Sequence, residues 1–126
     1  MKKRIIATAD APQAIGPYSQ AVDTGDFVFI AGQVPIVPAE GKIVAERVAG
    51  QTRQVLENIK EILAAAGLGL ENVVKTTVFL RSMGDFREMN EVYAAYFAND
   101  PPARATVEVA GLPLGALVEI EAVARR

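Results

Sequence analysis

The sequence predicts an α+β domain in which two helices cover one face of a mixed β-sheet. Runs rich in β-branched residues alternate with two segments of helical periodicity, in the order strand, strand, helix, strand, helix, strand, strand. The chain has 126 residues, enough for one ordinary domain and too few for two. We therefore expect a single domain over residues 1–126 with its own hydrophobic core.

The first strands are expected near the N-terminus. Residues 2–7 predict a short edge strand, and residues 8–20, rich in Pro, Gly and Ala, predict a loop. A β-rich run at residues 26–34 breaks at Pro35, because proline cannot donate to a sheet ladder. Residues 38–42 predict a turn.

The run at residues 26–34 is apolar on both sides. Phe27 and Phe29 alternate with Val28 and Ile30, and successive side chains of a strand point to opposite faces. The predicted helices cover one face only, so we expect self-association to bury the other.

The first helix is predicted over residues 44–66 and closes at Gly67, a favourable C-terminal cap. Apolar or small residues recur at steps of four and three, as one face of a helix requires. They are Val48, Thr52, Val55, Ile59, Ile62 and Ala66. The β-branched run at residues 73–80 then predicts the next strand.

A second helix is predicted to begin at Asp85, with Glu88 three residues later as a capping-box partner. Aromatic residues at helical spacing favour a core position, and the apolar face of this helix holds Phe86, Met89, Tyr93 and Tyr96 or Phe97. We expect the helix to end near Asn99, because Pro101 and Pro102 cannot continue it.

The C-terminal quarter predicts two strands with charges at unusual positions. Arg104 opens the first strand and shares one face with Thr106 and Glu108, while Glu119 and Glu121 lie inside the second. A guanidinium presents a planar fork that matches a carboxylate, and a glutamate can accept a proton or orient a water. Together these residues suggest a small site for an anionic substrate with an acid/base group beside it.

Each of these charges also has a purely structural interpretation. Arg104 is equally consistent with a solvated arginine at a strand edge. Glu119 and Glu121 are also typical of a polar outward face, and one of them can instead pair with Arg104. Spacing alone does not decide which glutamate faces a pocket.

Two weaker candidates precede the first helix. Residues 16–20 (GPYSQ) are either a turn or part of a binding site. In the second case the ring of Tyr18 forms a wall of the site and its hydroxyl offers a hydrogen bond. Residues 31–35 (AGQVP) are either a strand end with a bulge at Gly32 or a place where a ligand approaches the backbone.

Composition excludes several classes of chemistry. The chain has no Cys and no His, which rules out disulfides, cysteine nucleophiles, Ser-His-Asp triads and zinc sites built on Cys or His. Proton transfer therefore falls to carboxylates, Tyr, Lys or water. The net charge of −2 offers no basic surplus for nucleic acid. No signal-peptide or membrane-spanning run is visible, so we expect a cytoplasmic protein.

Taken together, seven stretches resemble the RidA family, also called YjgF, of small imine and enamine deaminases, and they cover essentially the whole chain. They are AIGPYSQAV at 14–22, FIAGQVP at 29–35, the helix at 51–67, VVKTTVFL at 73–80, MGDFREMNEVYAAYF at 83–97, PPARATVEVAGLP at 101–113 and VEIEAVA at 118–124.

The resemblance implies a chorismate-mutase-like α+β fold assembled as a homotrimer with clefts between subunits. It implies hydrolysis of 2-iminopropanoate and 2-iminobutanoate to the 2-oxo acid and ammonia, without cofactor or metal. Such imines arise from pyridoxal-phosphate enzymes and damage other enzymes.

The resemblance also implies a role for particular residues. Arg104 would hold the substrate carboxylate, and Glu119, rather than Glu121, would orient or deprotonate the attacking water. Tyr18 would line the cleft, the backbone at Gly32 would contact the substrate, and Asn90 would lie near it.

Two positions depart from the family pattern. Thr106 stands where relatives often carry Cys, a position that the chemistry does not require. Ala31 stands where they often carry Ser before the cleft glycine, and the loss of that hydroxyl bears on affinity and substrate range.

Three rival functions stay open at this point. The first is a non-catalytic module that binds a small carboxylate. The second is an RNA-directed role, which low basicity and the absence of His disfavour. The third is chorismate mutase activity. Its substrate is a dianion, and a single prominent arginine offers little positive charge to bind it.

Overall fold

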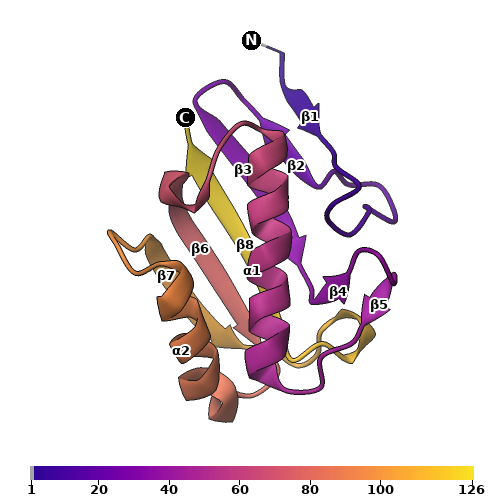
Figure 1. Cartoon of the computed structure of the whole chain (residues 1–126), viewed down its shortest axis with the longest axis vertical. Helices are drawn as coiled ribbons and strands as arrows, with labels where there is room; N and C mark the ends of the chain where they lie inside the picture. Colours follow the sequence, from indigo (N-terminus) through magenta and orange to yellow (C-terminus); the bar gives the residue numbers. More distant parts are fainter. Residues whose placement is uncertain (1) are drawn as a thin grey trace.

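The computed structural model describes residues 2–126, in which two helices lie on one face of a six-stranded sheet (Figure 1). The strand order is β1-β2-β3-β8-β6-β7, and β4 and β5 form a separate hairpin. The strands are β1 Arg4–Ile6, β2 Ala21–Asp23, β3 Phe27–Gln33, β4 Ile36–Val37, β5 Lys42–Ile43, β6 Val73–Leu80, β7 Ala103–Glu108 and β8 Val118–Arg125. The helices are α1 Val48–Ala65 and α2 Phe86–Tyr96, and short 3₁₀ turns lie at Leu70–Asn72 (η1), Met83–Asp85 (η2) and Pro113–Gly115 (η3).

The predicted mixed sheet with two helices on one face is confirmed. Neighbouring strands are antiparallel except β6 and β7, which run parallel because α2 forms the crossover between them. Three strands were not predicted: β2, with three residues, and the hairpin strands β4 and β5, with two each. Runs this short carry too few residues for an alternation to be recognised.

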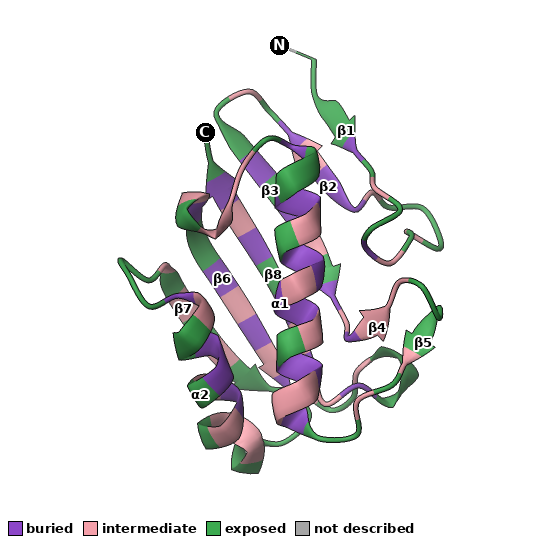
Figure 2. Ribbon diagram, viewed as in Figure 1, coloured by how far each residue is buried: buried purple, intermediate pink, exposed green. Residues whose placement is uncertain are grey.

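The core lies between the helices and the sheet, where buried residues alternate along the strands (Figure 2). Every second residue of β8 from Val118 to Ala124 is buried, and the whole predicted stripe of α1 is buried as well. A fully buried side chain of this kind contributes roughly 1.5–3 kcal/mol. The helix begins at Val48, four residues later than predicted.

Two buried amides of α1 bond to backbone groups next to β3 and β8. Asn58 donates from Nδ2 to the carbonyls of Val34 and Ile36, at 3.2 and 3.0 Å. Gln51 accepts from the backbone N–H of Leu117 at 2.8 Å through Oε1. Because buried polar groups need partners, these bonds fix the end of β3 and the start of β8 against one helix.

The predicted capping box of α2 is wrong. Asp85 makes no side-chain cap, and Glu88 reaches across to α1 instead. There its carboxylate accepts from the backbone N–H of Ala49 at 3.3 Å and pairs with Arg47 at 2.6 Å. A carboxylate is favourable at a helix N-terminus, and α1 has no side-chain cap of its own at Arg47, so the contact between the two helices prevails.

The second face of the sheet is left open within this chain. Phe27 and Phe29 are 38% and 48% exposed there, with ring centroids 6.4 Å apart, whereas Val28 and Ile30 are buried under the helices. The prediction that both faces of β3 are apolar is thus confirmed. Exposed aromatic area of this kind is typical of an interaction surface.

Candidate active site

The charged residues predicted for the site lie on opposite faces of the sheet. Arg104 on β7 is in register with Thr76 on β6, and both point toward α2. Glu119 stands between Val118 and Ile120, which are buried under the helices, so its side chain points to the open face. One chain therefore does not bring Arg104 and Glu119 together.

Arg104 is held by α2 and not by a carboxylate. Its Nη1 donates to Asn90 Oδ1 at 2.8 Å. Its guanidinium carbon lies 4.7 Å from the ring centre of Tyr93 and 5.6 Å from that of Phe86. Within residues 2–126, no carboxylate oxygen lies within 4.0 Å of this guanidinium, so neither glutamate of β8 pairs with it. The Nε and Nη2 hydrogens likewise have no recorded acceptor there, which leaves part of the fork available to an anion.

Glu119 lines an open cavity of about 370 Å³ on the other face. The walls are the loop from Pro12 to Tyr18, the end of β3 at Gly32, and Leu114 of η3. Tyr18 and Gly32 therefore lie with Glu119, whereas Asn90 lies with Arg104. The five residues predicted for the site thus lie in two groups on opposite faces, each a candidate half-site.

Gly32 allows the carboxylate of Glu119 to lie against the backbone. A Cβ at this position would meet the Glu119 carboxylate and lie 2.9 Å from its Cδ, closer than real Cβ contacts. The register shifts here, because Ile30 and Gln33 of β3 face Ala122 and Ile120 of β8. The bulge interpretation of this segment is thus confirmed, and the bulge lies beside Glu119.

The environment of Glu119 suits a base. Burial, and secondarily the negative charge of Glu121 two residues away on the same face, raise the pKa of Glu119 above its usual value. A carboxylate with a raised pKa accepts a proton more readily. Glu121 itself is exposed and lies by Lys75 and Thr77 rather than in the Glu119 cavity.

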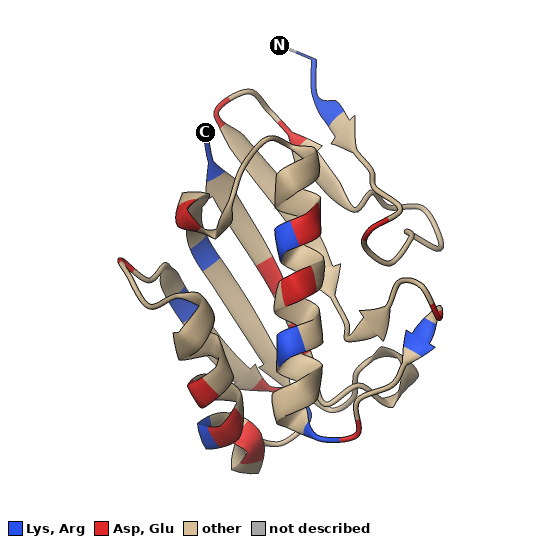
Figure 3. Ribbon diagram, in the orientation of Figure 1, with Lys and Arg blue, Asp and Glu red and all other residues tan. Residues whose placement is uncertain are grey.

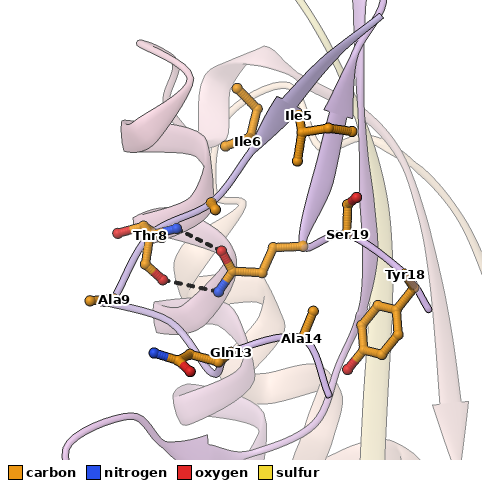
Figure 4. Close-up of a pocket in the computed structure, with 10 residues that line it drawn as sticks. Ile5, Ile6, Thr8, Ala9, Gln13, Ala14, Tyr18 and Ser19 are labelled. Carbon is orange, nitrogen blue, oxygen red and sulfur yellow. Dashed lines mark hydrogen bonds between the residues drawn. The ribbon is translucent and has the colours of Figure 1, made fainter. Parts of the chain in front are cut away.

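Tyr18 stands between two cavities. Besides the Glu119 cavity it lines a second one of about 440 Å³, on the side opposite Thr8 (Figure 4). Its hydroxyl accepts from the backbone N–H of Ile15 at 3.4 Å, and its side chain is half exposed. The buried Gln20 anchors this loop, because its amide accepts from the Thr8 N–H and donates to the carbonyls of Thr8, Ala11 and Pro12.

The sequence interpretation missed the aromatic neighbours of Arg104. Phe86 and Tyr93 were assigned only to the apolar face of α2, yet both also flank the guanidinium. The signal was present, since Phe86, Asn90 and Tyr93 follow the i, i+4, i+7 spacing of one helix face. Thr106 also points to the side of Arg104, and its buried Oγ1 has no partner among residues 2–126.

The described part of the chain shows no group of three carboxylates placed to hold a metal ion. None of its helices is long and apolar enough to cross a membrane. Figure 3 shows basic and acidic residues interspersed along α1 and α2, without a separate basic stripe on either helix.

Comparison with known proteins gives the family. A family model described as Endoribonuclease L-PSP matches residues 8–126. A RutC family protein of Pyrococcus horikoshii is 58% identical over 122 residues, which is 97% of each chain. The human 2-iminobutanoate/2-iminopropanoate deaminase is 51% identical over 122 residues, 97% of this chain and 89% of the human one.

A solved structure of similar sequence has the same fold as this chain. E. coli TdcF with bound serine superposes with a TM-score of 0.94 at 47% identity, over 98% of each chain. The α+β fold of this chain is therefore shared with a solved structure of similar sequence. The chain belongs to the RidA (YjgF) family.

Proposed function

We propose that this chain hydrolyses the reactive imines 2-iminopropanoate and 2-iminobutanoate to 2-oxo acids and ammonia. The observation that carries the proposal is the pair of half-sites. Arg104 offers a fork whose Nε and Nη2 hydrogens have no acceptor among residues 2–126, and Glu119 offers a partly buried carboxylate with a raised pKa beside a cavity. The name of the human relative, which shares about half of its residues with this chain, supports the same chemistry.

A second copy of the chain is needed to complete the site. The substrate carboxylate and the reacting C2 atom are joined by a single bond, so no small substrate spans the sheet from Arg104 to Glu119. We propose that Arg104 of one subunit faces Glu119 of the partner subunit in a cleft between them. Such a contact joins two different surfaces, and it closes into a ring when the chain is a homotrimer. The exposed Phe27 and Phe29 favour burial of the open face in the same assembly.

In the proposed reaction, Arg104 binds the substrate carboxylate through two N–H groups and thereby fixes C2. Glu119 accepts a proton from a water, and the water oxygen bonds to C2 while the C=N electron pair moves to nitrogen, which takes a proton. The resulting carbinolamine loses ammonia when its hydroxyl proton passes by way of Glu119 to the nitrogen, the C–N bond breaks and the C=O bond forms. Positioning lowers the barrier by several kcal/mol, and one general base contributes roughly 10²- to 10⁴-fold.

Tyr18, Gly32 and Asn90 complete the proposal. Tyr18 lines the cleft, the backbone at Gly32 contacts the substrate, and Asn90 lies near it while bonded to Arg104. We propose that the chain acts as a single domain over residues 1–126, needs no cofactor or metal, and works in the cytoplasm without a nucleic-acid or membrane partner. Ala31, where relatives often carry Ser before the cleft glycine, bears on affinity and on the range of imines accepted.

The test is oxo-acid release from an imine generated in place by threonine dehydratase, with semicarbazide competing for the intermediate. We expect the wild-type chain to divert the imine and Arg104→Ala to fail while remaining trimeric. Arg87→Ala, which changes a nearly fully exposed arginine of α2, is the matched control. Turnover by Arg104→Ala at the wild-type rate would refute the role of Arg104.

The main alternative is a non-catalytic module that binds a small carboxylate. Binding of 2-oxobutanoate by a folded trimer that diverts no imine would favour it. The description of the matching family model also names a ribonuclease. A net charge of −2 and the absence of His disfavour that activity for this chain, and salt-sensitive RNA binding would revive it.

A further inference from the structure

The guanidinium of Arg104 rests on one stripe of α2. Phe86, Asn90 and Tyr93 are spaced i, i+4 and i+7, so they occupy one face of the helix. Asn90 accepts one N–H of the guanidinium at 2.8 Å, and the two rings lie within 6 Å of its carbon. The nearer ring, 4.7 Å away, belongs to Tyr93.

The ring of Tyr93 is itself anchored through its hydroxyl. Its hydroxyl shares a 2.6 Å hydrogen bond with Thr76 Oγ1 in the protein interior. The ring of Phe97 lies beside it, tilted by 40° with the ring centroids 4.7 Å apart. Only 5% of Tyr93 is exposed. Thr76 is also the residue in register with Arg104 across β6 and β7, so the hydroxyl bond ties the ring to the strand pair that carries the arginine.

An aromatic face supports an arginine without consuming its donors. The face of a ring attracts a cation through its quadrupole, whereas the N–H groups of a guanidinium lie in the guanidinium plane. A carboxylate in the place of Tyr93 would occupy the fork instead. The ring therefore stabilises the charge while the Nε and Nη2 hydrogens keep no recorded partner within residues 2–126.

We propose that Tyr93 is a positioning residue for Arg104, whose ring face holds the guanidinium so that its fork stays turned toward a planar carboxylate. Asn90 fixes the rotation of the fork, and Thr76 fixes the ring. The inference rests on the proposed function only in taking a carboxylate as the ligand, and it holds whether or not that ligand is turned over.

Three variants test it. Tyr93→Leu removes the ring face, and Tyr93→Phe keeps the ring but gives up the bond to Thr76. Phe97→Leu is the matched control, because it removes an aromatic side chain that packs on Tyr93 from the same helix end. The probe is 2-oxobutanoate, titrated calorimetrically into the full-length assembled protein, with thermal unfolding measured alongside.

We expect Tyr93→Leu to weaken 2-oxobutanoate binding roughly tenfold, the size of a partly desolvated cation–π contact. With an imine substrate, KM should rise more than kcat falls, because binding of the carboxylate is lost before the chemical step. Tyr93→Phe should restore binding to within about threefold of wild type. Phe97→Leu should lower the unfolding temperature and leave binding within about twofold.

A second readout needs neither turnover nor ligand. The side-chain Nε–Hε NMR signal of Arg104, identified by its loss in Arg104→Lys, should be shifted by the ring of Tyr93. It should move to the position of an unrestrained arginine in Tyr93→Leu only. If Tyr93→Leu does not fold, Phe86→Leu removes the other ring, which is only partly buried, and should move the same signal by a smaller amount.

Two results would overturn the inference. One is a folded Tyr93→Leu protein with unchanged binding and an unchanged Arg104 signal. The other is a loss of binding in Phe97→Leu as large as that in Tyr93→Leu, which would assign the effect to packing. Failure of the proposed deaminase activity is distinguishable, because wild type would then bind 2-oxobutanoate without turnover. If wild type does not bind it at all, the Arg104 signal still decides.

Discussion

Gly32→Ala should displace the carboxylate of Glu119, the proposed base, without unfolding the protein. In Gly32→Ala the new Cβ would lie 2.9 Å from Glu119 Cδ and 3.3 Å from its Cγ, and would overlap one carboxylate oxygen. Ordinary contacts of this kind exceed 3.4 Å, so the Glu119 head must swing away. Gly32 does not have a positive φ, and alanine can adopt its backbone.

The expected changes in stability and in kcat follow from the displacement of the Glu119 side chain. The atoms displaced are the far end of a flexible side chain, so the stability cost is that of an off-rotamer glutamate, about 0.5–1.5 kcal/mol. It is partly offset by about 0.4–1 kcal/mol, because alanine restricts the unfolded chain more than glycine does. The catalytic loss is that of a misplaced general base, roughly 10²- to 10⁴-fold in kcat.

The assay is imine diversion by wild type, Gly32→Ala, Glu119→Gln and the double variant, with Gly111→Ala as the matched control. A Cβ at Gly111 meets nothing within 4 Å, so this control should act as wild type. If the methyl acts only through Glu119, Gly32→Ala should add nothing in the Glu119→Gln background. Full activity in Gly32→Ala, or losses that simply add in the double variant, would refute the reasoning.

The remaining predictions concern charge and burial. Glu121→Gln removes a negative charge near Glu119 and should lower the pKa of Glu119. The acidic limb of the pH profile of kcat/KM should then move to lower pH. A shift to higher pH would contradict the assignment of Glu119 as the base. Hydrogen bonds from Arg126 and the Gly25 backbone hold the pKa of Asp23 at about 2, below its usual 3.8. The contribution of Asp23 to stability is therefore complete above pH 3.8 and is lost as the pH falls through about 2. Asp23→Asn should therefore flatten the unfolding temperature over that interval, and an unchanged slope would contradict this. Thr106→Val replaces a buried hydroxyl that has no partner among residues 2–126 by a methyl group. In denaturant titrations the free energy of unfolding should stay equal or rise by roughly 1 kcal/mol. A fall in the free energy of unfolding by more than about 1 kcal/mol would show that the hydroxyl has a partner in the assembly.

The long elements were predictable because their signals repeat. The stripe of α1 from Val48 to Ala66 and the β-branched run of β6 each contain enough residues to fix a period. The capping box of α2 failed because Glu88 had a better partner at the N-terminus of α1, a tertiary contact that local spacing does not encode. The buried amides Gln51 and Asn58 were invisible for the same reason, since their partners lie far along the chain.

The sequence named the residues of the candidate site but did not indicate how they are arranged. The alternation along β8 is regular enough to place Glu119 opposite the core, yet β7 is an edge strand with little burial on either face. No pattern in its sequence indicates that Arg104 turns toward the helices. The separation of the two half-sites therefore emerges only when the strands are in register.

That separation has a genetic consequence. In the proposed ring each chain serves two clefts, giving its arginine to one and its glutamate to the other. Two inactive chains, Arg104→Ala and Glu119→Gln, would then complement each other when they are co-assembled. Random mixing in equal amounts rebuilds about a quarter of the clefts with both groups intact, whereas either chain alone rebuilds none.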